Sequence, residues 1–159
     1  MSELKVRIIE LEPLRVASVL GFGETPEDLA WKKLTTWAKA QGIYQDLNQH
    51  RIFGFNNPNP SPGSPNYGYE FWITVGPEVE PEGEVEIKEF PGGLYAVTRC
   101  HVDKKPYETI PAAWESLVRW REDSSYRHAD HQWLEEHLWL DEYPEGDWDL
   151  DLYLPIAEG

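Results

Sequence analysis

Two glutamates of this 159-residue chain lie in short stretches rich in aromatic residues. Glu70 stands in the string Tyr-Glu-Phe-Trp, and Glu135 in the string Trp-Leu-Glu-Glu-His. A carboxylate among aromatic rings attracts a delocalised cation, through its charge and through ring–cation contacts worth about 0.5–2 kcal/mol each. If it is poorly solvated its pKa rises, and with a water molecule beside it the group suits a general base. The pattern therefore predicts a site for a flat cation or for a hydrolytic reaction.

Strand parity predicts which side chains share a face with these carboxylates. Successive side chains of a strand point to opposite faces. In the stretch 148–156 the alternating leucines are expected to meet the helices, which leaves Tyr153 on the free face, and Phe71 and Ile73 are likewise expected to point inward. In the stretch 133–140 the leucines are also expected on the helix side, with Glu136 as the exception. The predicted catalytic residues are Glu135 and Glu70, and the predicted ligand-binding residues are Trp72, Tyr69, Trp133, His137, Trp139, Tyr153, Phe55 and Glu142.

A plainer interpretation stays open beside this one. The tryptophans could simply pack against a sheet, with both carboxylates solvated at the surface. An exposed aromatic row of this size is costly unless something covers or binds it, which favours a ligand pocket.

The elements that must position these residues occur twice. Ala-Trp-x-x-Leu-x-x-Trp stands at 30–37 and again at 113–120, and Phe-Trp-Ile-Thr-Val at 71–75 is echoed at 152–156. Val-Arg-Ile-Ile-Glu at 6–10 is echoed at 85–89. The repeated Trp-x-x-Leu-x-x-Trp string is expected to form core packing. We predict a single domain over 1–159 built from two pseudo-repeats, 1–80 and 81–159.

Each pseudo-repeat is expected to contain two strands, a helix and two more strands. The second strand of each is expected to form a hairpin with the first. Thr25 and Pro26 indicate a helix start and Gly42 its end, with prolines also in the first turns of the second helix. The expected strands are 4–12, 14–22, 51–57, 67–75, 84–90, 94–102, 133–140 and 148–156, and the expected helices begin at residues 26 and 106. This order predicts an α+β fold with a curved antiparallel sheet, two helices on one face and a central ligand cleft.

The composition of the chain indicates which classes of binding partner are improbable. The formal net charge is −15, with 14 basic against 29 acidic residues, which argues against binding to nucleic acid because phosphate binding depends on Lys and Arg.

No apolar run is long enough for a membrane span, and the start of the chain lacks a signal-peptide pattern. A lone cysteine, Cys100, fits a reducing cytoplasm. His128, Asp130 and His131 lack a well-spaced further ligand, so no metal and no cofactor are expected. The oligomeric state is left open.

Two strings resemble a known family. Leu-Glu-Glu-His-Leu at 134–138 and Asp-Leu-Tyr-Leu-Pro-Ile at 151–156, within a doubled module, are similar to the GyrI-like small-molecule-binding domain. That domain is also the effector-binding part of some MerR-type and AraC-type regulators. Where the family has Glu-x-Tyr, this chain has Glu135-x-His137. The resemblance implies an aromatic pocket with a buried glutamate that binds bulky, flat, often cationic compounds, and stand-alone members that hydrolyse cyclopropane-bearing genotoxins or buffer gyrase.

Two functions of different kinds follow. One is hydrolytic ring opening of a strained, flat compound, with Glu135 and Glu70 activating water and Tyr69, Tyr153 or His137 donating a hydrogen bond. The other is binding without chemistry, as a drug or toxin sensor, a sequestering protein or a gyrase-inhibitor-like protein.

Overall fold

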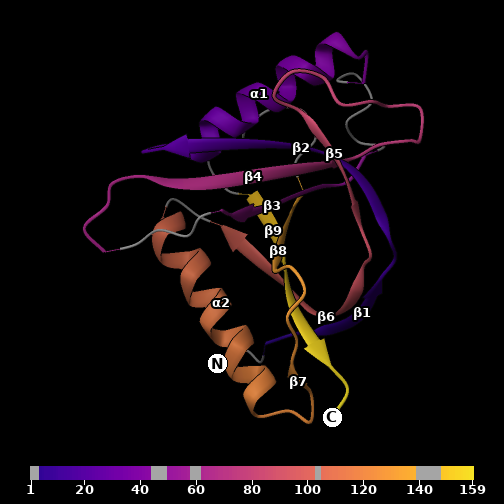
Figure 1. Ribbon diagram of the computed structural model, residues 1–159. Coiled ribbons are helices and arrows are strands. Elements are labelled where there is room, and N and C mark those ends of the chain that lie inside the picture. The colour runs from indigo at the N-terminus through magenta and orange to yellow at the C-terminus, as the bar shows by residue number, and fades with distance from the viewer. Residues whose placement is uncertain (1–3, 44–49, 58–61, 103–104, 139–147) are drawn as a thin grey trace. The chain divides into compact units, whose positions relative to one another are not determined.

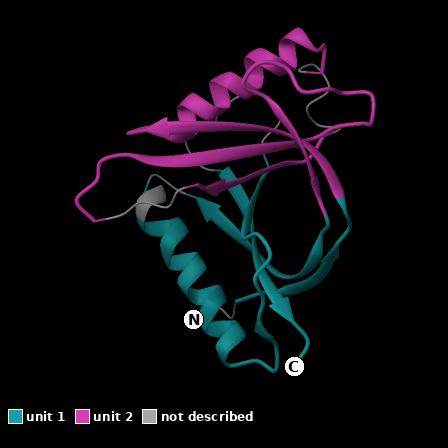
Figure 2. Cartoon of the chain, in the orientation of Figure 1, with its two compact units in different colours: residues 1–13, 91–139, 144–159 teal, residues 14–90, 140–143 magenta. Residues whose placement is uncertain are grey.

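The computed structural model describes residues 4–43, 50–57, 62–102, 105–138 and 148–159 (Figure 1). The chain divides into two compact units, shown in Figure 2. Unit 1 holds residues 1–13, 91–139 and 144–159, and unit 2 holds residues 14–90 and 140–143. Each unit combines an antiparallel sheet of curled strands with one helix, so the α+β class with a curved sheet is confirmed.

Unit 2 contains a four-stranded antiparallel sheet in the order β5-β2-β4-β3. Its strands are β2 (Leu14–Gly23), β3 (Ile52–Asn56), β4 (Tyr67–Thr74) and β5 (Glu86–Phe90). Helix α1 (Pro26–Ala40) packs against β2 and β4. All of these lie where the sequence predicts a helix or a strand.

Helix α1 is held to its sheet by the predicted tryptophan string. Trp31, Leu34 and Trp37 are buried, and the Trp31 ring meets Phe71 edge-on with ring centroids 5.4 Å apart. Thr25 stands at the N-cap position, where the sequence indicates the helix start, but its side chain makes no capping hydrogen bond. Gly21 of β2 lets the helix approach closely, because a Cβ at that position would collide with the backbone of α1.

Unit 1 has the corresponding sheet order β1-β6-β9-β8, with a short β7 also paired to β9. Its strands are β1 (Arg7–Leu11), β6 (Gly93–Val102), β7 (Arg127–His128), β8 (Leu134–His137) and β9 (Trp148–Ala157). Helix α2 (Pro106–Glu122) packs against β6 and β9.

The core of unit 1 lies between α2 and one face of the sheet. Leu117 of α2 is fully buried with Leu150, Leu152 and Leu154, the predicted apolar row of β9. Trp114 and Trp120 pack against this cluster, so the second tryptophan string also serves core packing, as predicted. Cys100 is buried in the same cluster.

The pairing of the first strands differs from the prediction. Among the described residues, β1 pairs with β6 and β2 pairs with β5, so the predicted hairpins of 4–12 with 14–22 and of 84–90 with 94–102 are wrong. Each unit thus takes its outer strand from the other half of the sequence. Gly92, at φ 82°, closes the turn between β5 and β6, and a Cβ there would collide with the backbone of Leu11 and Glu12 at the end of β1.

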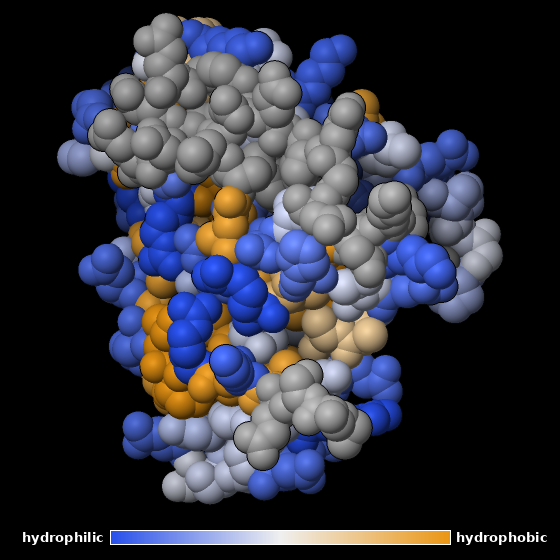
Figure 3. All heavy atoms as spheres, turned by 180° about the vertical axis from the view of Figure 1, so that it is seen from behind, coloured by the Kyte–Doolittle hydropathy of each residue, from blue (hydrophilic) through white to orange (hydrophobic). Residues whose placement is uncertain are grey.

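The surface is mostly hydrophilic on the face seen in Figure 3, although some hydrophobic atoms reach it. Two of the large hydrophobic side chains that are exposed, Leu20 and Phe22, lie on β2. Neither described helix is long and apolar enough to cross a membrane.

Candidate ligand-binding site

Glu70 of β4 is a buried carboxylate that accepts four side-chain hydrogen bonds within unit 2. Oε2 accepts from Ser18 Oγ at 2.6 Å, from Trp72 Nε1 at 2.6 Å and from Lys88 Nζ at 2.8 Å. Oε1 accepts from Asn57 Nδ2 at 3.0 Å. The residue is only 2% exposed, so these donors replace the water that a carboxylate normally binds.

The donors set the charge of Glu70. Burial by itself would raise the pKa of this carboxyl group. The hydrogen bond from Lys88, followed by those from Ser18, Trp72 and Asn57, outweighs burial, and the pKa is lowered below its ordinary value of 4.5. Glu70 is therefore ionised at neutral pH, in contrast to the raised pKa expected for an unsatisfied carboxyl group among aromatic rings.

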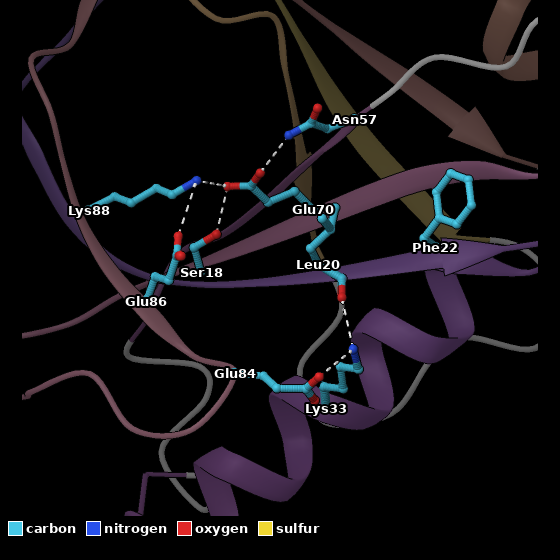
Figure 4. Close-up of a pocket in the computed structure, with 9 residues that line it drawn as sticks. All are labelled: Ser18, Leu20, Phe22, Lys33, Asn57, Glu70, Glu84, Glu86 and Lys88. Atoms are coloured by element: carbon cyan, nitrogen blue, oxygen red, sulfur yellow. Dashed lines mark hydrogen bonds and ion pairs between the residues drawn. The ribbon is translucent and has the colours of Figure 1, made fainter.

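A cavity of about 520 Å³ opens beside Glu70, a volume within the range of small-molecule sites. Figure 4 shows the side chains of the cavity, which come from α1, from strands β2, β4 and β5, from Glu84 before β5 and from Asn57 directly after β3. Two of them, Leu20 and Phe22, are apolar and remain 44% and 57% exposed. The lining residues are Ser18, Leu20, Phe22, Lys33, Asn57, Glu70, Glu84, Glu86 and Lys88.

The charged groups of the cavity are paired. Lys33 Nζ lies 3.4 Å from Glu84 Oε1 and donates to the Leu20 carbonyl at 3.1 Å. Lys88 Nζ lies 2.8 Å from Glu70 and 4.0 Å from Glu86 Oε2. Three carboxylates and two ammonium groups leave the lining with a formal charge of −1.

The aromatic rings of Trp72 and Phe55 lie next to Glu70 on the same face of the sheet. Strand register places both on the same face as Glu70, because Phe55 is paired with Glu70 across β3 and β4, and Trp72 follows two residues later on β4. The Trp72 ring meets Phe55 edge-on at 5.0 Å and Phe90 at 5.3 Å. Three of the predicted site residues, Glu70, Trp72 and Phe55, therefore lie on one face, although only Glu70 of the three lines the cavity.

Tyr69 lies on the other face of β4. Its buried ring meets Phe71 edge-on at 5.0 Å and covers Gly54, where a Cβ would collide with it. Phe71 in turn contacts Trp31 of α1, as the inward position predicted for Phe71 requires. Tyr69 therefore packs on the helix side of the sheet of unit 2 and does not join Glu70 in the cavity.

In unit 1 the predicted parity of β8 is wrong by one residue. Glu135 is paired with Leu152 and His137 with Leu150, both on the face that packs against α2. Trp114 Nε1 of α2 accordingly donates to Glu135 Oε2 at 3.1 Å. Because this face excludes solvent, burial lowers the pKa of His137 from 6.5 to about 3.

Trp133, just before β8, is also near the helix. Its ring lies 5.3 Å from the Trp114 ring, at an interplanar angle of 42°. The free-face position predicted for Trp133, Glu135 and His137 is therefore incorrect, and their roles in binding or catalysis stay predictions. Trp139 and Glu142 lie outside the described residues.

The face of unit 1 opposite α2 carries a second set of polar contacts. Tyr153, on this face as predicted, donates through its hydroxyl group to Glu136 Oε1 at 2.7 Å. Asp151 is buried and accepts from Arg99 Nε at 2.8 Å and from Arg7 Nη2 at 2.9 Å. Burial would raise the pKa of Asp151, but the hydrogen bonds from Arg99 and Arg7 lower it.

The polar partners of Glu70, and Asp151 with its two arginines, are not among the residues predicted from the sequence. One signal in the sequence does point to Asp151. The repeat offset of 81 that relates Trp72 to Tyr153 (153 − 72 = 81) also relates Glu70 to Asp151 (151 − 70 = 81). A buried carboxylate therefore stands two residues before a buried aromatic ring on β4 and again on β9, the strands that hold corresponding positions in the two sheets.

The His128 cluster does not form a metal site in the part of the chain that the structure describes. His128 pairs with Asp130 at 3.0 Å, whereas the His131 ring contacts the Leu94 carbonyl at 2.8 Å. No group of three or more His, Cys, Asp or Glu residues converges among the described residues.

Two α+β units of matching strand order, with a cavity over a buried glutamate, define a small-molecule-binding protein of duplicated architecture. The chain belongs to the family of the GyrI-like small molecule binding domain, whose model matches residues 4–157. The resemblance seen in the sequence is thereby confirmed.

Three proteins show what the chain is similar to in sequence or in fold. A DNA gyrase inhibitor of Erwinia billingiae (strain Eb661) is 26% identical over 167 residues, covering 98% of this chain and 99% of that protein. The cryo-EM structure of an EcmrR-DNA complex has a TM-score of 0.70 at 15% identity, and the match covers 98% of this chain but only 58% of the EcmrR chain. A hydrolase from Listeria innocua has a TM-score of 0.64 at 14% identity, covering 99% and 94%. At these identities, the structural likeness shows the fold.

Proposed function

We propose that this protein binds flat, largely hydrophobic cations in the cavity beside Glu70 and acts as a sensor or sequestering protein for them. The observation that carries the proposal is an ionised, buried carboxylate next to a 520 Å³ cavity with exposed Leu20 and Phe22. The apolar side chains would cover the flat body of a ligand. The formal charge of −1 in the lining and of −15 over the chain favours a positive ligand.

Titration with the dye cation rhodamine 6G tests this proposal through quenching of tryptophan fluorescence, since Trp72 donates directly to Glu70. We expect Phe22→Ala to weaken binding by about 1–2 kcal/mol, because it removes apolar area that the ligand would cover. Glu70→Gln should weaken it by at least about tenfold, since the cation loses its charged partner. Glu115→Gln on α2 changes the net charge equally at an exposed position outside the cavity, and should bind like the parent protein. Equal affinities in all four proteins would refute the site.

Hydrolysis of strained, cyclopropane-bearing compounds is a second candidate, and the contact of Tyr153 with Glu136 supports it. A carboxylate held by a phenol on the sheet face opposite α2 is suited to take a proton from water. The water oxygen would form a bond to a cyclopropane carbon, and the breaking carbon–carbon bond would deliver its electrons to a conjugated carbonyl. That carbonyl would become a phenol after protonation. The likeness in fold to a structure named as a hydrolase agrees with this chemistry without specifying it.

Adjacent glutamates on opposite faces of β8 provide a matched test of hydrolysis. Incubation with a cyclopropane genotoxin and mass spectrometry would reveal a product heavier by one water. Glu136→Gln should abolish that product, whereas Glu135→Gln, which alters the side chain bonded to Trp114, should retain it. Loss of activity in Glu135→Gln alone would instead support the residue that the sequence analysis selected. Binding without a hydrated product would leave the sensor or sequestering role.

Gyrase inhibition is a further alternative, supported by the name of the Erwinia billingiae relative. A supercoiling assay with purified gyrase tests it, and undiminished supercoiling at excess protein would exclude it.

A further inference from the structure

Lys88 occupies the position beside Glu70 that a bound cation would need. Its ammonium group is 2.8 Å from Glu70 Oε2, and Figure 4 shows it reaching the carboxylate from β5. The Lys88 side chain is 39% exposed, whereas that of Glu70 is 3% exposed. A ligand cation that approaches Glu70 from the cavity therefore meets a positive charge first.

Among the three donors to Glu70 Oε2, Lys88 is also the one that can leave most readily. Ser18 and Trp72 are buried and fixed by their strands, with exposures of 4% and 6%. Lys88 ends a flexible aliphatic chain, and a second carboxylate, Glu86, lies 4.0 Å from its ammonium group. The Glu86 side chain is 74% exposed, so an ion pair with Lys88 could form there in contact with solvent.

When Lys88 leaves, Glu70 loses both a hydrogen-bond donor and a neutralising positive charge. Glu70 Oε2 would lose one of its three donors although the Glu70 side chain is only 3% exposed. An unsatisfied buried acceptor costs more than an ordinary hydrogen bond contributes, and more still when it is charged. A ligand with N–H hydrogens on its positive group replaces both the charge and the donor. A quaternary ammonium or phosphonium group replaces only the charge.

We propose that Lys88 is an internal counter-ion that a ligand cation must displace, and that the acceptor it vacates on Glu70 favours cations bearing N–H donors, such as protonated amines, amidines and guanidines, over cations without them. A ligand of this class takes the place of Lys88 on Glu70, and Lys88 moves to Glu86. This inference rests on the proposed binding function and names the ligand class for that same cavity.

Three matched probes test it: 2-naphthylmethylammonium, its N,N,N-trimethyl analogue and neutral 2-naphthylmethanol. Calorimetric titration at pH 7 should give a Kd for the primary ammonium that is lower than that of the quaternary analogue by at least about tenfold. Lys88→Met should tighten both cations by at least about tenfold and leave their ratio nearly unchanged, because no internal cation then competes with either ligand while the acceptor on Glu70 is the same. Lys88→Arg restores a competing charged N–H donor and should return both Kd values toward those of the parent protein.

Lys33→Met is the matched control, since it removes a lysine of the same cavity that pairs with Glu84 and not with Glu70. It should leave both Kd values close to those of the parent protein. Equal affinities for the two cations in the parent protein, or Kd values that Lys88→Met leaves unchanged, would overturn the role of Lys88 while leaving the cavity as a binding site. Failure of all three probes to bind would overturn the proposed function and this inference together.

Discussion

His137 should make the stability of the protein depend on pH between 5 and 7.5. The residue is buried beside the α2 face of β8, and its ring stacks on Trp148 at 6.1 Å. Burial lowers its pKa from 6.5 to about 3 in the folded protein. At a pH between these two pKa values, the His137 imidazole carries a proton in the unfolded chain but not in the folded protein. Stability is therefore complete above pH 6.5 and falls as the pH decreases toward 3.

The size of the effect follows from the two pKa values. At pH 7.5 the imidazole is neutral in both states and adds almost nothing. At pH 5 it is mostly protonated in the unfolded chain and neutral in the folded protein. This pH lies about 1.5 units below 6.5, the pKa of the imidazole in the unfolded chain. At about 1.4 kcal/mol per unit, the free energy of unfolding should decrease by roughly 2 kcal/mol over this range.

Urea unfolding followed by tryptophan fluorescence at pH 7.5, 6.5 and 5.0 measures this change. His137→Phe keeps an aromatic ring to stack on Trp148 and removes the titrating group, so its pH dependence should be smaller than that of the parent protein by roughly 2 kcal/mol. Leu134→Ala, a control in the same strand, should lower stability at every pH without altering the pH dependence. If His137→Phe and the parent protein showed the same pH dependence, the imidazole would be solvated, and the helix-side position of β8 would be refuted.

Two further perturbations test the fold around the sites. Gly21→Ala should destabilise the protein by about 1–3 kcal/mol, because its Cβ collides with the backbone of α1, and an unchanged melting temperature would contradict this close approach. Asp151→Asn should lower the free energy of unfolding at pH 7 by about 1–2 kcal/mol, since it removes the charged acceptor of Arg99 and Arg7. The difference should diminish as the pH falls through the lowered pKa of Asp151, and Arg7→Met should have a smaller effect because Arg99 remains.

Much of the fold could be predicted because the local patterns are strong. The Trp-x-x-Leu-x-x-Trp strings identify both helices and the side that each one buries. Alternation in β4 and β9 is also clear, because each strand carries an unbroken apolar row on one face. Glu70, Trp72 and Tyr153 were accordingly assigned to the correct faces.

The strand β8 could not be oriented in the same way. Only Leu134 of its four residues is a hydrophobic residue, and Glu135-Glu136 places a carboxylate on each face, so the sequence contains no alternation. Leu138, which guided the predicted parity, lies beyond the end of the strand and is exposed. The predicted parity therefore puts Glu135 on the wrong face, whereas the pairing with β9 places Glu136 on the same face as Tyr153, whose hydroxyl group donates to it.

The exchange of first strands and the partners of Glu70 require contacts that are distant in sequence. Either pairing of β1 and β5 satisfies the same local alternation, so the short connection at Glu12-Pro13 misleadingly favours a hairpin. Lys88 reaches Glu70 only because β5 pairs with β2, which stands next to β4 in the sheet. A lysine on an outer strand gives no sign in the sequence that its ammonium group binds a buried carboxylate.

The indole N–H signal of Trp72 in a ¹⁵N-correlated NMR spectrum tests the central claim most directly, because that group donates to Glu70 at 2.6 Å. The signal can be assigned by its loss in Trp72→Phe. On titration with 2-naphthylmethylammonium we expect this signal to shift and saturate, while the indole signals of Trp31 and Trp37 on α1 stay in place. Saturable binding that shifts the signals of Trp114 and Trp133 and leaves Trp72 unchanged would contradict a ligand site at Glu70.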